Sequence, residues 1–308
     1  MKKILPAILL CCVIFANQPM KAQYYYYNDR FYDTDLVYEF GTAIGIMNCF
    51  TDLGGKRGIG KNFIKDLNWK NSKLSGGIYF MAMYQNKVGV RLGVTFGNIT
   101  AYDSILKPVA PTTYGRYERN LSFKSTINDF QLCLEIHPVF IFGNYYEGNP
   151  PRWSPYAVAG IGYFSFDPQA ILNGRWYSLQ PLHTEGQGFA EYRRRKPYKL
   201  NQINYPVGLG VKYELSSYLN MRIELVHRIL TTDYLDDAST SYIDPALFAN
   251  YLTPQQALAA ELLADRQYET IPGHITAPGE QRGDPRDKDA FFTIQLKIGL
   301  TLGRERRK

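Results

Sequence analysis

The segment 289–303, DAFFTIQLKIGLTLG, has a strict period of two that constrains the fold of this chain more than any other feature. Every second residue is apolar, in the series Phe292, Ile294, Leu296, Ile298, Leu300 and Leu302. The alternate positions begin with Phe291 and continue with polar residues or glycine: Thr293, Gln295, Lys297, Gly299 and Thr301. Because side chains alternate along a strand, this pattern predicts a strand with one fully apolar face.

The N-terminus predicts export. Lys2 and Lys3 form a charged start, residues 4–16 form an apolar stretch, and residues 20–22 (Met-Lys-Ala) suit a cleavage site before Gln23. This is the pattern of a secretory signal peptide, and it is too short for a transmembrane helix. No later stretch approaches 18 consecutive apolar residues. If the exported chain enters a membrane, we therefore expect it to do so as a β-barrel.

Composition argues against nucleic-acid binding, a disulfide and a metal site. The formal charge of +7 includes three lysines of the predicted signal peptide, so the mature chain carries about +4 and is not expected to bind nucleic acid. Cys49 and Cys133 both fall in apolar strand patterns, which favours two unpaired thiols over a disulfide. No cysteine or histidine spacing indicates a metal or another cofactor. The 25 tyrosines are typical of a barrel with aromatic girdles.

Eight segments have strand character, and each is long enough to cross a bilayer when tilted, which takes about 9–11 residues. They are 36–49, 73–84, 87–99, 121–137, 155–166, 200–215, 219–230 and 290–303.

Short and long connections alternate between these segments. Three are short or of middle length, and four are long: 50–72, 100–120, 167–199 and 231–289. This alternation predicts an all-β, eight-stranded antiparallel transmembrane barrel of the outer-membrane type, with tight periplasmic turns and long outer loops. The predicted divisions are a signal peptide (1–22), a periplasmic N-terminal segment (23–35), the barrel (36–303) and a basic C-terminal tail (304–308).

A soluble lipocalin-like barrel is the alternative to the membrane barrel. It would turn the apolar faces inward and leave many strand charges on the outside around a glycine-rich core. In the membrane barrel those charges face a narrow lumen, where they are tolerated only as partners of one another. We therefore expect a structural charge network and a plugged lumen, formed by Glu39, Arg91, Glu135, Lys212, Glu214, Arg222, Glu224 and Lys297.

The last long loop contains a helix signal. In TPQQALAAELLADRQ, Thr253 can cap the helix, Pro254 suits its first position and Gln256 completes a capping box. Leu258, Leu262 and Leu263 would share its apolar face, so we expect a short amphipathic helix that packs on the loop or the barrel rim.

Catalysis is the weaker interpretation of the loop acids. His227 near the outer end of its strand is followed by Asp233, Asp236, Asp237 and Asp244, a set that could activate water or hold calcium. Their spacing matches no calcium loop, and His137, His183 and His274 have no fixed relation to His227. We expect these aspartates to accept backbone N–H groups in turns, and the protein not to be an enzyme.

Two basic stretches have candidate partners. Residues 192–200, YRRRKPYKL, lie at the predicted outer headgroup level, where arginines suit lipopolysaccharide phosphates, although a solvated loop without a ligand explains them equally well. The tail 303–308, GRERRK, would meet periplasmic lipid headgroups or an acidic partner.

Several strings, in order, resemble the PorG-type outer-membrane barrels of the type IX secretion system. They are VYEFGTAIGIMNCFTDLGG, RNLSFKSTINDFQLCLEIHPVF, PYAVAGIGYFSFDP, YPVGLGVKYELSSYLNMRIELVHR, DYLDDASTSYIDP and GEQRGDPRDKDAFFTIQLKIGLTLG. The resemblance spans nearly the whole mature chain. The long last loop and the basic end GRERRK, where such barrels often finish on an aromatic residue, depart from the pattern.

The resemblance implies a non-enzymatic barrel that anchors or positions the periplasmic ring, with PorK-, PorN- and PorM-like subunits as partners. The surface facing them would be periplasmic: residues 24–35, the turn 138–154 and the tail 303–308, with Phe140, Tyr145, Tyr146 and Trp153 as candidate contacts. The alternatives are a stand-alone structural or surface-binding barrel and, less favoured, a hydrolase at the outer rim.

Overall fold

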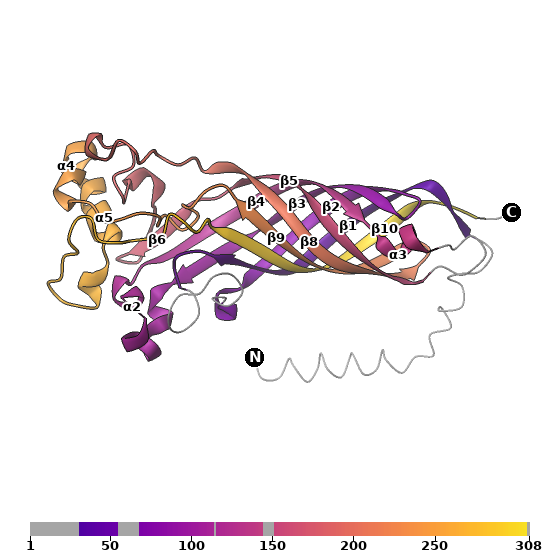
Figure 1. Cartoon of the computed structure of the whole chain (residues 1–308), viewed down its shortest axis with the longest axis horizontal. Coiled ribbons are helices and arrows are strands. Elements are labelled where there is room, and N and C mark those ends of the chain that lie inside the picture. The colour runs from indigo at the N-terminus through magenta and orange to yellow at the C-terminus, as the bar shows by residue number, and fades with distance from the viewer. Residues whose placement is uncertain (1–30, 55–67, 114, 144–150, 307–308) are drawn as a thin grey trace.

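A computed structural model of the chain describes residues 31–54, 68–113, 115–143 and 151–306. Its central feature is a set of eight long strands within these residues (Figure 1). They are β1 (Phe31–Phe50), β2 (Lys73–Tyr84), β3 (Val88–Tyr102), β4 (Ser122–Ile136), β5 (Trp153–Ser165), β8 (Asn201–Ser216), β9 (Leu219–Leu230) and β10 (Ala290–Arg306).

The eight strands form a closed antiparallel barrel. Each pairs with its neighbours in the order β3-β2-β1-β10-β9-β8-β5-β4, and β4 returns to pair with β3. The seam between the first and last strands is continuous, with Gly41 opposite Gly299 and Ile46 opposite Ile294. Closure gives every barrel strand two partners, which removes the unpaired edges that lipid would not tolerate. The predicted fold class is confirmed.

β1 and β10 run further than expected. β1 begins at Phe31, inside the predicted N-terminal segment, and β10 ends at Arg306, inside the predicted tail. Phe31 pairs with Arg306, and the register shifts between Asp33 and Tyr38. The two strands therefore continue as a ribbon beyond the barrel, while the predicted signal peptide lies outside the described residues.

The outward face of the barrel is apolar. From Ile294 to Leu302 the apolar residues of the last strand alternate with buried Gln295 and Lys297, and Leu302 is 58% exposed. Phe292, expected on the same face, is buried, and its ring packs with those of Phe50 and Trp69. The neighbouring strands repeat this arrangement, so a continuous band of large apolar side chains faces outward: Phe40, Ile44, Ile78, Val90, Leu92, Phe130, Leu132, Val207, Leu209, Ile223, Leu225 and Leu300. Such a surface suits contact with lipid, and the barrel is of the outer-membrane type.

Aromatic side chains mark both ends of the apolar band. Tyr84, Trp153 and Tyr218 are exposed at the end with the tight turns, and Trp69 is exposed near the opposite end. Tyrosine and tryptophan favour the two membrane–water interfaces because their rings are amphipathic. Among the described helices, none is long and apolar enough to span a bilayer.

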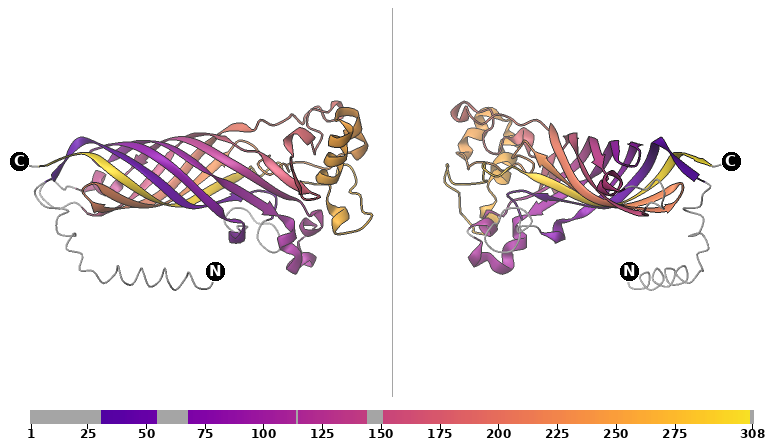
Figure 2. Two further views of the ribbon diagram at one scale, coloured as in Figure 1. Left: turned by 180° about the vertical axis from the view of Figure 1, so that it is seen from behind. Right: turned by 45° about the vertical axis from the view of Figure 1, so that its right-hand side comes forward.

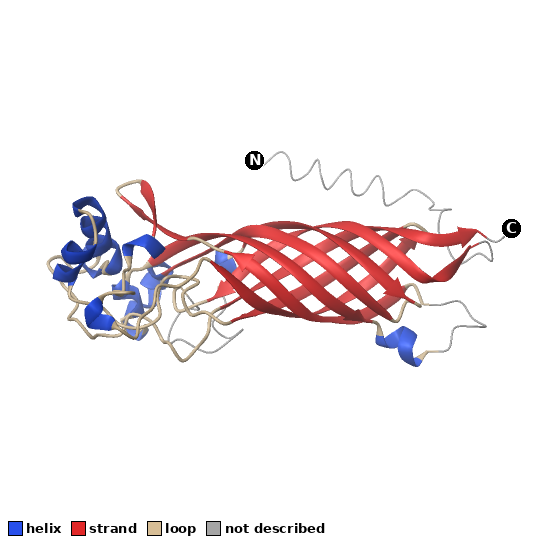
Figure 3. Cartoon of the chain, turned by 90° about the horizontal axis from the view of Figure 1, so that it is seen from above, coloured by secondary structure: helices blue, strands red, loops and turns tan. Residues whose placement is uncertain are grey.

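The two ends of the barrel differ greatly (Figures 2 and 3). Tight turns and α3 (Pro138–Phe142) lie at one end, near both described chain ends. The long loops fold into a compact body at the other end, here called the loop cap (51–54, 103–113, 115–121, 166–200 and 231–289). The cap contains the helices α2 (Arg116–Arg119), α4 (Phe248–Tyr251) and α5 (Pro254–Ala264) and the short strands β6 (Pro168–Leu172) and β7 (Arg175–Ser178). It also contains 3₁₀ turns at Asp103–Thr112, Gln180–Leu182, Ala190–Tyr192, Pro245–Leu247 and Gln267–Glu269. A further 3₁₀ turn, at Trp69–Asn71, precedes β2.

Two apolar clusters hold the cap together. One lies where the barrel meets the cap, and its residues Phe164, Leu235 and Phe291 are completely buried. The other lies within the cap, where Phe248 and Phe189 pack with the helix α5. An apolar core of its own gives the cap the organisation of a small folded unit instead of a set of independent loops.

The helix α5 has the predicted start and a different buried face. Thr253 and Gln256 form the capping box as expected. Leu258, however, is 59% exposed, and the buried residues are Leu263 with three alanines, Ala259, Ala260 and Ala264. The expected face is therefore right for Leu263 and wrong for Leu258, because close contact with the cap core selects the small side chains.

Candidate functional site

Charged side chains fill the barrel lumen. The structure places all eight residues of the expected network inside the barrel, and each is at most 6% exposed: Glu39, Arg91, Glu135, Lys212, Glu214, Arg222, Glu224 and Lys297. Lys212 and Glu214 pair with each other at 3.1 Å. The remaining six form one connected group.

Arg222 is the centre of that group. Its Nε donates to Glu39 Oε1 at 2.8 Å and its Nη2 to Glu39 Oε2 at 2.7 Å, which makes a bidentate pair. Its Nη1 donates to Glu135, which also accepts from Arg91 Nη1 at 3.0 Å. Glu135 further lies 2.9 Å from His137 Nε2. One carboxylate therefore compensates two guanidinium groups.

Glu224 is the second shared carboxylate. It accepts from both Nη atoms of Arg91, from Lys297 and from the Tyr156 hydroxyl, the last at 2.8 Å. An eight-stranded barrel has room inside only for side chains, and this network occupies that room across the middle of the barrel. The arrangement suits a rigid plug and not a pore.

A second layer of polar side chains, not predicted from the sequence, lies in the lumen nearer the cap. Arg228 Nε donates to Asp129 Oδ2 at 3.1 Å, Asn204 donates to Asp129 Oδ1 at 2.9 Å, and Arg228 Nη1 donates to Thr293 Oγ1 at 2.6 Å. The sequence does contain this information. Asp129 is an even number of residues from Glu135 on the same strand, and Arg228 is an even number from Glu224, so both side chains must lie on the inward face. Cys49 and Cys133 are buried and free, as expected.

The structure corrects part of the predicted partner surface at the end of the barrel with the tight turns. Phe140 is only 9% exposed, because α3 turns it towards the barrel, so it cannot serve as a surface contact. Trp153, the first residue of β5, is 58% exposed, and Phe142 in α3 is 87% exposed. Tyr145 and Tyr146 lie outside the described residues. Of the predicted set, the described part of the chain therefore leaves Trp153 exposed, and Phe142 is a further exposed aromatic residue at this end.

The structure separates two of the residues considered for catalysis, His227 and Asp236. His227 lies on the outward face of β9, with its ring 5.9 Å from that of Phe50. Asp236 is buried in the cap, where its carboxylate accepts from the backbone N–H groups of Leu53 and Ala238. Asp244 likewise accepts from the N–H of Ala246. These two aspartates therefore organise the loops, as expected, whereas Asp237 accepts from the hydroxyl groups of Thr184 and Tyr198 instead of from backbone N–H groups.

Burial perturbs several cap carboxyls. It raises the pKa of Asp233 to about 7, with repulsion from Asp52 adding to the effect. Burial also raises the pKa of Asp52 to about 6 and that of Asp237 to about 6, against opposing interactions with Arg119 and Arg282 respectively. No three Asp, Glu, His or Cys side chains in the described part of the chain are placed to hold a metal ion.

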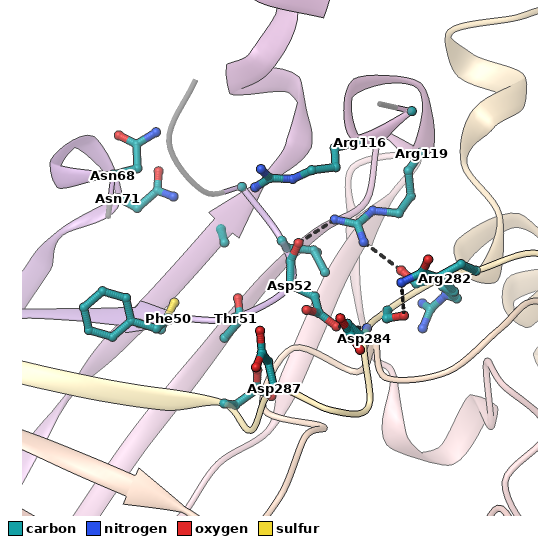
Figure 4. Close-up of a pocket in the computed structure, with 18 of the residues that line it drawn as sticks. Phe50, Thr51, Asp52, Asn68, Asn71, Arg116, Arg119, Arg282, Asp284 and Asp287 are labelled. Atoms are coloured by element: carbon teal, nitrogen blue, oxygen red, sulfur yellow. Dashed lines mark hydrogen bonds between the residues drawn. The ribbon is translucent and has the colours of Figure 1, made fainter. Parts of the chain in front are cut away.

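A cavity of about 1130 Å³ opens where the cap meets the barrel rim (Figure 4). Its walls come from the end of β1, the turn at 68–71, the region of α2 and the segment 280–290. Asp52, Asp284 and Asp287 lie along one wall, and Arg119 and Arg282 lie beside it. This volume is slightly larger than that of most small-molecule sites, roughly 300–1,000 Å³.

Comparisons with known proteins give only distant likenesses. No family model and no curated protein matches the chain. The N-terminal β-barrel domain of Pseudomonas aeruginosa OprF is 10% identical, with a TM-score of 0.31 and coverage of 88% of this chain and 100% of that one. Neisserial surface protein A is 8% identical (TM-score 0.37, coverage 86% and 96%), and a major outer membrane protein of Thermus thermophilus is 14% identical (0.38, 87% and 100%).

Proposed function

We propose that this protein is a non-enzymatic outer-membrane barrel that anchors or positions the periplasmic ring of a type IX secretion machine. The observation that carries the proposal is the ion-paired plug, because a barrel whose lumen is filled by Arg91, Arg222 and their carboxylate partners suits an anchor and not a conduit for cargo. The sequence resemblance to PorG-type barrels supplies the identity of the partners, which are PorK-, PorN- and PorM-like subunits.

Exposed aromatic residues at the turn end support a protein contact there. Phe142 and Trp153 are both more than half exposed beside tight turns, on the side that the predicted topology assigns to the periplasm. Aromatic residues are enriched at protein interfaces, so this end suits a ring subunit. Lipid is a second partner in the proposal, since Arg193, Arg194 and Lys196 are exposed for phosphate contacts, whereas Arg195 is bound to Glu185 O and Ser241 within the cap.

The test is a gentle-detergent pull-down of the tagged protein from outer membranes of a strain that possesses the ring, with recovered proteins identified by mass spectrometry. We expect stoichiometric recovery of ring lipoproteins, and a Phe142→Ser/Trp153→Ser variant should lose them. Trp176→Ser, a change of an exposed tryptophan in the β6–β7 hairpin, is the matched control and should retain them. Recovery of the barrel alone at normal expression would refute the secretion role.

The second candidate is a surface-binding barrel, and the organised loop cap favours it. Long loops that fold around a core of their own and enclose a cavity suit recognition of a ligand. This candidate predicts a phenotype when the cap is altered and none when Phe142 and Trp153 are changed.

A further inference from the structure

On one side of the cap, the barrel sheet continues beyond the apolar band. Phe130, which is 57% exposed, is the last large apolar residue on the outer face of β4, and the polar residues Asn128 and Thr126 follow it towards the cap. The hairpin β6–β7 then extends the sheet, because β6 pairs with β4 and β7 pairs with β6 (Figure 1). The cap therefore presents an outward sheet face beyond the surface that suits lipid.

Five side chains share this outward face, here called the hairpin platform. Side chains of directly opposite residues lie on the same face of a sheet, and Gln169 is opposite Lys124 on one side and Ser178 on the other. Ile171 is opposite Trp176 in the next row towards the hairpin turn. The reverse face of the hairpin packs on the cap core, so the face open to solvent is the platform: Lys124, Gln169, Ile171, Trp176 and Ser178.

An exposed indole beside fixed polar groups suits a saccharide. Trp176 is 49% exposed, and Lys124 Nζ lies 5.4 Å from the centroid of its ring, in a cation–π contact. Asp167 accepts from Gln169 Nε2 at 2.6 Å and from Ser178 Oγ at 3.0 Å, which holds both side chains in place. A sugar ring has apolar C–H groups that pack on an aromatic ring and hydroxyls that need hydrogen-bond acceptors. The oxygens of Gln169 and Ser178 can supply those acceptors.

The charges at the platform favour an anionic ligand. Lys124 and the neighbouring Arg175 of β7 contact aromatic rings, and neither has a carboxylate partner in the described part of the chain. Asp167 is the one acid of segments 122–126 and 167–178. Two cations against one acid suit a saccharide that carries phosphate groups.

The height of the platform indicates which saccharide it meets. Lys124 is six residues beyond Phe130, which is about 15 Å along the barrel axis at a rise of about 3.3 Å per residue and a tilt of about 40°. Tyr163, opposite Phe130 and also exposed, marks the same edge of the apolar band. The headgroup region extends only about 5–7 Å beyond the hydrocarbon core on each side. In an outer leaflet, the phosphorylated core sugars of lipopolysaccharide lie beyond that level.

We propose that the hairpin platform binds the phosphorylated core saccharide of lipopolysaccharide, with a sugar ring against Trp176 and a phosphate on Lys124. This adds a saccharide site to the lipid contacts of the proposed function. It rests on the outward orientation of the cap in that function and not on the secretion role. Binding is measured without ring subunits, so its failure and the failure of the pull-down are separate results.

The test is isothermal titration of the full-length protein, in uncharged detergent, with the phosphorylated core oligosaccharide obtained by complete deacylation of lipopolysaccharide. We expect one saturable site, and Trp176→Ala and Lys124→Gln should each weaken it by about fivefold to tenfold. Removing the phosphates from the oligosaccharide should weaken binding to the wild type by a similar factor and should have little further effect on Lys124→Gln. The heat-modifiable gel mobility of each variant reports whether the barrel is folded.

The matched control is Trp69→Ala/Lys70→Gln, which removes an exposed tryptophan and an exposed lysine at the same end of the barrel, outside the platform. It should leave the affinity unchanged, and equal weakening would show non-specific attraction and overturn the proposal. Equal affinity for neutral dextran would overturn the phosphorylated class. Binding that survives both platform substitutions, or no saturable binding to the folded wild-type protein, would overturn the site.

Discussion

Glu135 is the residue on which the lumen network depends most. It is completely buried and serves two guanidinium groups, those of Arg91 and Arg222. Glu135→Gln keeps the volume and removes the charge, so Arg91 and Arg222 each lose one of their two carboxylate partners in the buried lumen. Breaking a buried pair in this way costs about 3–5 kcal/mol. We expect that loss in the free energy of unfolding, measured by urea denaturation of the barrel in lipid vesicles.

Glu261→Gln is the control for this measurement, because Glu261 is an exposed residue of α5 and its change should cost less than about 0.5 kcal/mol. If Glu135→Gln unfolds at the same urea concentration as the control, the network does not contribute to stability as described.

The buried carboxyls of the cap should make it sensitive to pH. Asp233, with a pKa of about 7, and Asp52 and Asp237, each about 6, hold their protons more tightly in the folded cap than in an unfolded chain, where the value is about 4. Folding therefore takes up protons, and the stability of the cap falls as pH rises from about 4 to about 7.

Hydrogen exchange of cap amides, corrected for the intrinsic effect of pH, should thus show stronger protection at pH 5 than at pH 7.5. Asp233→Asn should flatten this dependence, because an amide does not titrate. Protection that increases towards neutral pH would contradict the assignment.

At the scale of elements, the helix α5 offers a test of its capping box. Thr253 Oγ1 accepts the N–H of Gln256, and the Gln256 side chain accepts the N–H of Thr253. Thr253→Ala should destabilise the helix by about 1 kcal/mol, seen as faster amide exchange in 255–258. The lumen and the remaining cap should exchange as before, and global loss of protection would mean that the cap core depends on this helix start.

The strands were predictable because one physical rule governs them. Lipid outside and a crowded lumen inside impose the period of two, so β3, β8 and β10 could be identified from alternation alone. The orientation of β5 was harder to assign, since its inward positions include the apolar Val158 and Phe164. Inward apolar residues weaken the contrast between the two faces.

The buried face of α5 and the cavity were beyond sequence reasoning for a different reason. Both depend on contacts between distant loops, such as Arg282 with Glu185 and Arg119 with Asp52 O. Local periodicity contains no information about such pairs. The acid-rich segment 280–290 was visible, but its position opposite Asp52 was not.

For the whole molecule, the plugged lumen predicts that the barrel does not conduct ions. Planar bilayers containing the protein should show no steady conductance, because the ion-paired side chains leave no continuous water path through an eight-stranded barrel. An open porin inserted under the same conditions is the control and should conduct. Stable single-channel currents from the purified wild-type protein would contradict the plug.

The seam between β1 and β10 has a consequence for biogenesis. These strands are partners along almost their whole length, yet all the other barrel strands lie between them in the sequence. Until the last strand arrives, the sheet has two open edges and cannot remain stably in lipid. Closure is therefore the most non-local step of assembly, and such steps are slow. We therefore expect the apolar strands to need protection from aggregation until the barrel closes.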